Sequence, residues 1–295
     1  MNVSPKKAML LMALCAFLWS IGGLLVKLLP WHPLVICGLR SLIAAVIILL
    51  YMRLRKHRFT VSRCAILSGL GLAGTMLLFC AASKLTTSAN AIILQSTNPI
   101  HIMVLNTLLY HHRYRKGELV AVGITLAGIS LFFLDQLSPG NLLGNGIALC
   151  SGFTMAVMYL FGSRLPDEAS SMSSVLIGHG TAAAVGLVCA LFAPPAMGAA
   201  NLAAILTLGV VQLGVPYVLY AIAVRNCSPL SCSLIGMIEP LLNPVWVFLV
   251  IGERPGAFAL LGAAVVMVTV CVWSVLSARA PAPAGADVEN STSAA

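Results

Sequence analysis

Charged residues are scarce in this sequence, and their scarcity excludes a water-soluble fold. Only 8% of the 295 residues are charged, whereas 60% are hydrophobic and the mean hydropathy is +1.00. A soluble domain carries roughly 25% charged residues. The chain therefore cannot cover itself with a water-facing surface, and its apolar side chains must face lipid.

The motifs of metal sites and enzymes are missing as well. The nine cysteines include no CxxC pair, so we predict neither a metal site nor a disulfide. The sequence also contains no GxSxG or HExxH motif. We therefore predict that the protein is not an enzyme and binds no cofactor.

Long apolar stretches take the place of these motifs. A helix needs about 20 residues to cross the bilayer core, and ten stretches reach this scale: residues 8–29, 34–52, 64–83, 88–110, 118–134, 141–163, 170–193, 201–223, 230–251 and 256–277. The first is too long for a removable signal peptide. We predict an all-α integral membrane protein with ten transmembrane helices, and a disordered tail over residues 279–295.

The formal net charge of +9 is distributed unevenly between these spans. If the N-terminus is cytoplasmic, the cytoplasmic segments hold Lys6, Lys7, Arg53, Arg55, Lys56, Arg58, Arg63, Arg113, Arg115, Lys116, Arg164, Arg225 and Arg279. The outer segments hold only Lys27, Lys84 and Arg254. The positive-inside rule then predicts a multi-pass protein of the cell membrane with both termini in the cytoplasm. Contact with anionic lipid explains the basic residues, and no nucleic-acid partner is expected.

The chain also repeats itself. The segment KLTTSANAIILQSTNPIHIMVLNTLLYHHR (84–113) returns as RNCSPLSCSLIGMIEPLLNPVWVFLVIGER (225–254), with proline at the same place in both. Five spans per copy is an odd number, so the second copy enters the membrane from the opposite side. We predict two inverted five-helix repeats, residues 1–137 and 138–278. Paired proline-broken spans of this kind indicate the midplane binding site of a transporter.

Prolines free backbone groups at equivalent places in the two copies. Pro99 removes the hydrogen bond to the carbonyl of Gln95, and Pro240 removes that to Gly236. A free carbonyl at membrane depth needs another partner.

One face of the fourth predicted span is polar. On a helical wheel its polar residues fall within roughly 160° of one another: Asn90, Gln95, Asn98, His101 and Asn106. Such side chains cannot face lipid, so we expect them to face the protein interior or a wet cavity. In the ninth span Glu239 and Asn243 share a face in the same way.

Several of these residues have two interpretations. Glu239 is either a neutral or paired packing carboxyl group or a substrate or proton site, because an ionised carboxylate is costly at this depth. Arg40 lies about 9 Å of helix from the outer end of the second span, and either reaches the headgroups or pairs with a buried acid or a substrate anion. His101 is either a helix-contact residue or a proton carrier. Tyr220 shares a face of the eighth span with Gln212, whereas we expect Trp19 to pack rather than to line a cavity.

Taken together, these segments resemble the EamA family of the drug/metabolite transporter superfamily. The resemblance rests on FLWSIGGLLVK, GLRSLIAA, KLTTSANAIILQSTNPI, MIEPLLNPVWVFLVIGE and LLGAAVV. It implies a ten-helix inverted-repeat permease that transports amino acids, nucleosides, drugs or other metabolites. One departure is His111-His112-Arg113, where the family has Gly-Glu and a basic residue, as at 252–254.

We therefore predict a secondary transporter, in the inner membrane if bacterial, that exports small polar or amphipathic metabolites by alternating access. The expected site between spans four and nine comprises Gln95, Asn98, His101, Glu239, Asn243, Arg40 and Tyr220, with helix breaks at Pro99 and Pro240. Glu239 and His101 are the candidate proton carriers if transport is proton-coupled; an uncoupled facilitator or exchanger stays open. The alternative class is a non-transporting receptor or scaffold. Monomer and homodimer are equally open.

Overall fold

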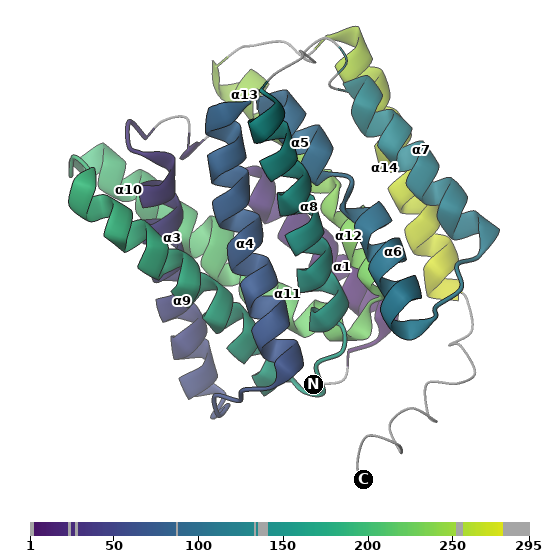
Figure 1. Ribbon diagram of the computed structural model, residues 1–295, viewed down its shortest axis with the longest axis horizontal. Coiled ribbons are helices and arrows are strands. Elements are labelled where there is room, and N and C mark those ends of the chain that lie inside the picture. The colour runs from purple at the N-terminus through teal and green to yellow at the C-terminus, as the bar shows by residue number, and fades with distance from the viewer. Residues whose placement is uncertain are drawn as a thin grey trace.

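The computed structural model describes residues 3–22, 25–26, 29–86, 88–132, 134, 141–251 and 256–279, and in these ranges it contains helices and no strand. The helices form an elongated bundle (Figure 1). Along the first half of the chain they are α1 (Pro5–Ser20), α3 (Pro33–Leu54), α4 (Arg63–Leu85), α5 (Ser88–Gln95), α6 (Asn98–Tyr110) and α7 (Lys116–Phe132). The second half contains α8 (Leu142–Gly162), α9 (Glu168–Phe192), α10 (Ala199–Thr207), the π-helix η2 (Leu208–Gly214), α11 (Val215–Ala223), the 3₁₀ turn η3 (Val224–Asn226), α12 (Pro229–Gly236), α13 (Ile238–Ile251) and α14 (Ala257–Arg279).

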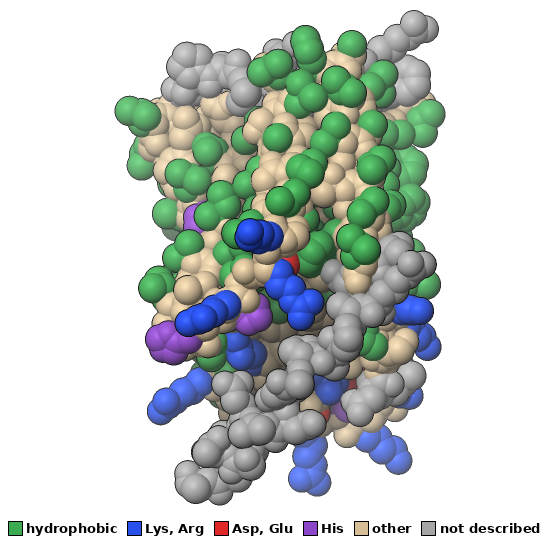
Figure 2. All heavy atoms as spheres, turned by 90° about the vertical axis from the view of Figure 1, so that its right-hand side faces the viewer, with side chains coloured by type: hydrophobic (Ala, Val, Ile, Leu, Met, Phe, Trp, Pro, Cys, Tyr) green, Lys and Arg blue, Asp and Glu red, His purple; other side chains and the backbone are tan. Residues whose placement is uncertain are grey.

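The bundle has the dimensions and surface of a multi-pass membrane protein. Six segments of the described chain are long and apolar enough to cross a bilayer: Pro33–Leu54, Arg63–Ser83, Asn90–Tyr110, Leu142–Gly162, Glu168–Phe192 and Ala199–Asn226. Shorter apolar helices cover Pro229–Leu242 and Leu260–Trp273. Hydrophobic side chains cover the upper part of the face in Figure 2, while Lys and Arg side chains gather toward the lower end. The all-helical membrane fold is confirmed, and the inverted ten-helix repeat stays a prediction.

Short polar residues fix where several helices begin. One side chain before each of α1, α4, α8, α9 and α12 accepts a hydrogen bond from a first-turn backbone N–H: Ser4, Ser62, Asn141, Asp167 and Ser228. The first N–H groups of a helix have no intrahelical partner, and such a cap contributes about 1 kcal/mol. The Ser170 N–H also lowers the pKa of Asp167, because this hydrogen bond favours the charged carboxylate.

Helices from the two halves of the chain pack against each other. α4 lies along α8 and α9, α3 lies along α9, and α7 lies along α14. At the α3–α9 crossing the backbones of Gly38 and Gly186 touch, since a Cβ built on Gly186 would lie 2.3 Å from the Gly38 Cα atom. Lipid offers no hydrophobic reward for helix association, so close packing through small residues stabilises this crossing.

The two proline-containing spans are broken, as their sequences predict. α5 ends at Gln95 and α6 begins at Asn98, while α12 ends at Gly236 and α13 begins at Ile238. The Asn98 Nδ2 atom donates to the freed carbonyl of Gln95 at 3.2 Å. The Ser233 hydroxyl of α12 donates to the Asn98 Oδ1 atom. One amide side chain therefore both satisfies the first break and joins it to the second broken segment.

Candidate functional site

A cavity of about 280 Å³ lies between the two broken spans. Its wall includes Trp19, Arg40, Gln95, Asn98, Gln212 and Glu239, which come from helices in both halves of the chain. Apolar and aromatic side chains make up much of the remaining wall. A concave, mostly apolar pocket with a few convergent polar groups is typical of a small-molecule binding site.

Arg40 and Glu239 place opposite charges on the cavity wall. The Arg40 Nη1 atom donates to Gln212 Oε1 at 3.4 Å, and its buried Nε atom has no hydrogen-bond partner in the described part of the chain. Within that same part, no ion pair joins Arg40 to Glu239 and no hydrogen bond occupies the Glu239 carboxylate. Arg40 thus lines the cavity, and its side chain is not paired with that of Glu239.

Gln212 holds Arg40 against the aromatic part of the wall. Its Nε2 atom donates to the Trp19 carbonyl at 3.2 Å, while its Oε1 atom accepts from Arg40. The Trp19 ring lies 5.1 Å from the Tyr217 ring, and the His179 ring meets Tyr217 edge-on at 4.6 Å. Trp19 therefore packs among buried aromatic rings, as expected, and also forms part of the cavity wall.

The structure brings together part of the predicted site. Gln95, Asn98, Arg40, Glu239 and Pro240 all line the cavity. The Gln95 Nε2 atom also donates to Ser151 Oγ at 2.6 Å, which fixes it against α8. Asn243 lies on α13, but its side chain falls outside the described part of the structure.

Other predicted residues lie elsewhere. His101 is half-buried and meets Phe153 edge-on at 6.0 Å, so it is a contact between α6 and α8. Tyr220 is buried behind the wall, where its hydroxyl donates to the Met158 carbonyl at 3.4 Å. Pro99 is buried in the first turn of α6. None of these three residues is part of the cavity wall.

Several wall residues escaped the sequence analysis, among them Cys37, Thr75, Cys80 and Ser233. Small residues such as these also fill ordinary helix contacts in membranes, so composition and spacing do not separate the two roles. For Cys37 the sequence did offer a signal. It lies one helical turn before Arg40, so both side chains share a face of α3.

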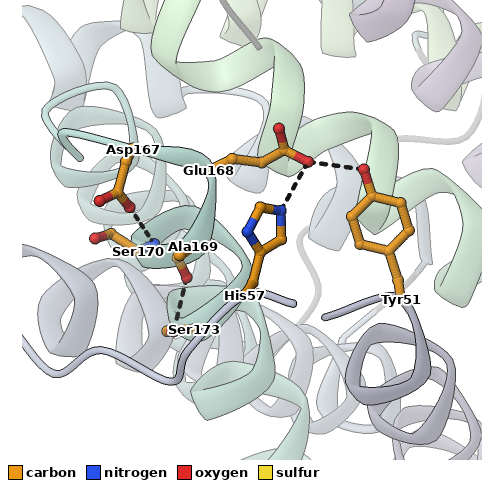
Figure 3. A network of polar contacts seen from close by, with 7 residues as sticks. All are labelled: Tyr51, His57, Asp167, Glu168, Ala169, Ser170 and Ser173. Carbon is orange, nitrogen blue, oxygen red and sulfur yellow. Dashed lines mark hydrogen bonds and ion pairs between the residues drawn. The ribbon is translucent and has the colours of Figure 1, made fainter. Parts of the chain in front are cut away.

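Two polar networks lie at the end of the bundle that carries the basic loops. In Figure 3, a Glu168 carboxylate oxygen accepts a hydrogen bond from the Tyr51 hydroxyl at 2.7 Å and lies 3.3 Å from His57 Nε2. Nearby, the Arg164 guanidinium lies 3.2 Å from the centre of the Tyr110 ring and donates to Asn106 Oδ1 at 2.9 Å. These contacts tie α3 to α9 and α6 to the loop after α8.

The cavity lies away from these networks. Its α3 residues, such as Cys37, come from the first turns of that helix, and its α4 residues, such as Ser83, come from the last turns of α4. The basic end holds the opposite ends of both helices, with Arg53 and Arg63. The cavity is therefore nearer to the end of the bundle opposite the basic loops.

A helical membrane bundle around a mostly apolar cavity with a few polar groups is the architecture expected of a membrane transport protein. The EamA-like transporter family matches residues 6–134 and 142–275, so the chain belongs to that family and is a membrane transporter. It is 24% identical over 272 residues to a protein of Archaeoglobus fulgidus named "Uncharacterized transporter", covering 87% of this chain and 93% of that one.

Two further similarities agree with this assignment. Over 151 residues the chain is 27% identical to a protein of Escherichia coli K12 named "Uncharacterized inner membrane transporter YedA", covering 50% of this chain and 49% of that one. A crystal structure of a protein with 18% sequence identity superposes with a TM-score of 0.80, covering 94% of this chain and 100% of that chain. The second similarity concerns the fold alone.

Proposed function

We propose that this protein exports small zwitterionic metabolites, of which amino acids are the simplest class, by alternating access around the central cavity. The observation that carries the proposal is the separated pair of charges, Arg40 and Glu239, on one largely apolar wall. Each buried charge without a partner costs several kcal/mol. A ligand with one carboxylate and one ammonium group offsets both costs at once.

The cavity also limits the size of the substrate. Pockets for drug-sized ligands measure roughly 300–1,000 Å³, and this one measures about 280 Å³. The volume therefore favours a metabolite of amino-acid size over a larger drug. Trp19 and Tyr217 supply an aromatic surface for its apolar part.

We infer that the hydrogen bonds at the basic end form an inner gate for alternating access. With the predicted orientation this end is cytoplasmic, so the networks around Glu168 and Arg164 close the inner path while the cavity lies toward the outside. This arrangement is the one that an exporter adopts at substrate release. Opening the inner path requires the Tyr51–Glu168 and Arg164–Asn106 hydrogen bonds to separate.

A panel of matched ligands tests this proposal. Thermal stabilisation of the purified protein is measured with amino acids, their methyl esters, which lack the carboxylate, and their N-acetyl derivatives, which lack the ammonium group. We expect the zwitterions to stabilise the protein most, because a ligand that binds only the folded state adds about 2.7 kcal/mol at 100 times its Kd. Counterflow in proteoliposomes then measures transport of the best ligand.

Two results would contradict the proposal. Equal stabilisation by an amino acid and its methyl ester would show that no carboxylate is recognised. Binding without counterflow would instead favour the alternative of a non-transporting receptor, which needs the cavity but no movement of substrate.

Glu239 is also the proton carrier that we propose, since it lines the cavity and His101 does not. We expect Glu239→Gln to lose accumulation driven by an imposed pH gradient, while exchange at saturating substrate continues. Uptake into proteoliposomes with and without the gradient measures both. His101→Gln should keep gradient-driven uptake, and a Glu239→Gln variant that keeps full gradient-driven flux would exclude the proton role.

A further inference from the structure

Two cysteines from neighbouring helices meet on the cavity wall. Cys37 of α3 and Cys80 of α4 both line the cavity. Both are free cysteines. The pair lies close to Arg40, which follows Cys37 by one helical turn on the same wall.

The packing of α3 against α4 gives an independent reason for this contact. The two helices are antiparallel neighbours, and the Ser41 Oγ atom of α3 lies 3.8 Å from the Met76 sulfur of α4. One turn back along α3 from Ser41 is Cys37, and one turn onward along α4 from Met76 is Cys80. Residues one turn apart lie on the same helix face, so antiparallel register places the two thiols opposite each other.

The two sulfur atoms of Cys37 and Cys80 suit a ligand that binds two thiols. No group of three or more His, Cys, Asp or Glu side chains in the described ranges could hold a metal ion. A structural zinc site, which takes four such ligands, does not fit. A trivalent arsenic centre that carries one organic group has two exchangeable positions and fits a pair of thiols.

We propose that Cys37 and Cys80 form a dithiol site for trivalent organoarsenicals of the type RAs(OH)₂. Binding is a condensation: two S–H bonds and two As–OH bonds break, two As–S bonds form, and two water molecules leave. No atom is oxidised or reduced. The bound arsenical bridges α3 to α4 and occupies the part of the cavity beside Arg40.

Phenylarsine oxide, which hydrates to this type of compound, is the probe. The full chain is purified in detergent, reduced with a phosphine and freed of reductant, and the probe is added before maleimide labelling. We expect mass spectrometry of the intact wild-type protein to show one arsenical per chain. Peptide mass spectrometry should show that the half-buried Cys80 is protected from the maleimide, whereas Cys37 is buried and is tested by its variant. Addition of 2,3-dimercaptopropanol should restore labelling of Cys80.

Variants distinguish this pair from another pair of cysteines, Cys227 and Cys232. Cys37→Ser and Cys80→Ser should each weaken binding of the probe by about 100-fold, because one thiol loses the gain from two linked contacts. Cys227 and Cys232 are both buried and do not line the cavity, so the Cys227→Ser/Cys232→Ser variant should bind as the wild type does. Unchanged binding by the two single variants, or protection of cysteines other than Cys37 and Cys80, would overturn the proposal.

Discussion

Replacing Arg40 with glutamine should weaken binding of the zwitterionic ligand by about 100-fold, or roughly 3 kcal/mol. The guanidinium presents a buried Nε atom without a partner and an Nη1 atom held by a long 3.4 Å hydrogen bond. A carboxylate can pair with both nitrogens in the two-bond geometry that arginine favours. Glutamine keeps a polar group at this place but removes the charge.

We expect the Arg40→Gln variant to lose its preference for an amino acid over its methyl ester, rather than to bind all ligands more weakly. The Arg40→Gln variant should bind an amino acid and its methyl ester with similar affinity, because only the free carboxylate used the guanidinium. Isothermal titration with the two ligands measures the ratio directly. Reciprocally, Glu239→Gln should lose the preference for a free ammonium group over its N-acetyl derivative.

Arg53→Gln is the matched control, since it removes the same charge from an exposed residue near the basic end. It should leave the ratio of amino acid to ester unchanged. If Arg40→Gln kept the wild-type ratio, the carboxylate would not bind at Arg40, and the proposed orientation of the substrate would be wrong.

The sequence was sufficient to locate the polar positions that an apolar membrane protein cannot place against lipid. Arg40, Asn98 and Glu239 stand out because charged and amide side chains are costly at membrane depth. The helix breaks before Pro99 and Pro240 follow from proline's missing N–H. These residues all lie near the cavity or at the breaks beside it.

A helical wheel drawn over the whole span does not show how its two parts are arranged. The wheel that grouped His101 with Gln95 assumes one continuous helix, yet α5 ends at Gln95 and α6 begins at Asn98. His101 lies on α6, beyond the break, and its ring meets Phe153 edge-on.

Tyr220 illustrates the same limit in the eighth predicted span. The residues from Leu208 to Gly214 form a π-helix, whose hydrogen bonds run from i to i+5. The wider turn rotates the residues after it relative to a straight α-helix. Gln212 within η2 and Tyr217 after it line the cavity, whereas Tyr220 is buried outside its wall. Nothing in the apolar sequence of η2 predicts this irregular turn.

A larger side chain at Gly186 should destabilise the whole bundle. A Cβ there would lie 2.3 Å from the Gly38 Cα atom and 2.6 Å from the Leu34 carbonyl oxygen. These neighbours are backbone atoms, which cannot turn away as a side chain can, so α3 and α9 must separate. We expect Gly186→Val to cost about 3 kcal/mol, at the upper end of the usual cost of overpacking.

Thermal denaturation followed by size-exclusion chromatography measures this effect. Gly180→Val is the matched control, because Gly180 lies on the same helix and its Cβ would meet nothing within 4 Å. It should unfold close to the wild-type temperature, while Gly186→Val should unfold well below it. Equal unfolding temperatures for the two variants would show that the α3–α9 contact is not tight.

The same substitution should also affect ligand binding. Because Gly38 lies two residues before Arg40 on α3, separating these helices should displace Arg40 from Gln212 and weaken ligand binding. Gly186→Val should therefore lower both the unfolding temperature and the affinity for a ligand carboxylate. Gly180→Val should keep both at the wild-type level.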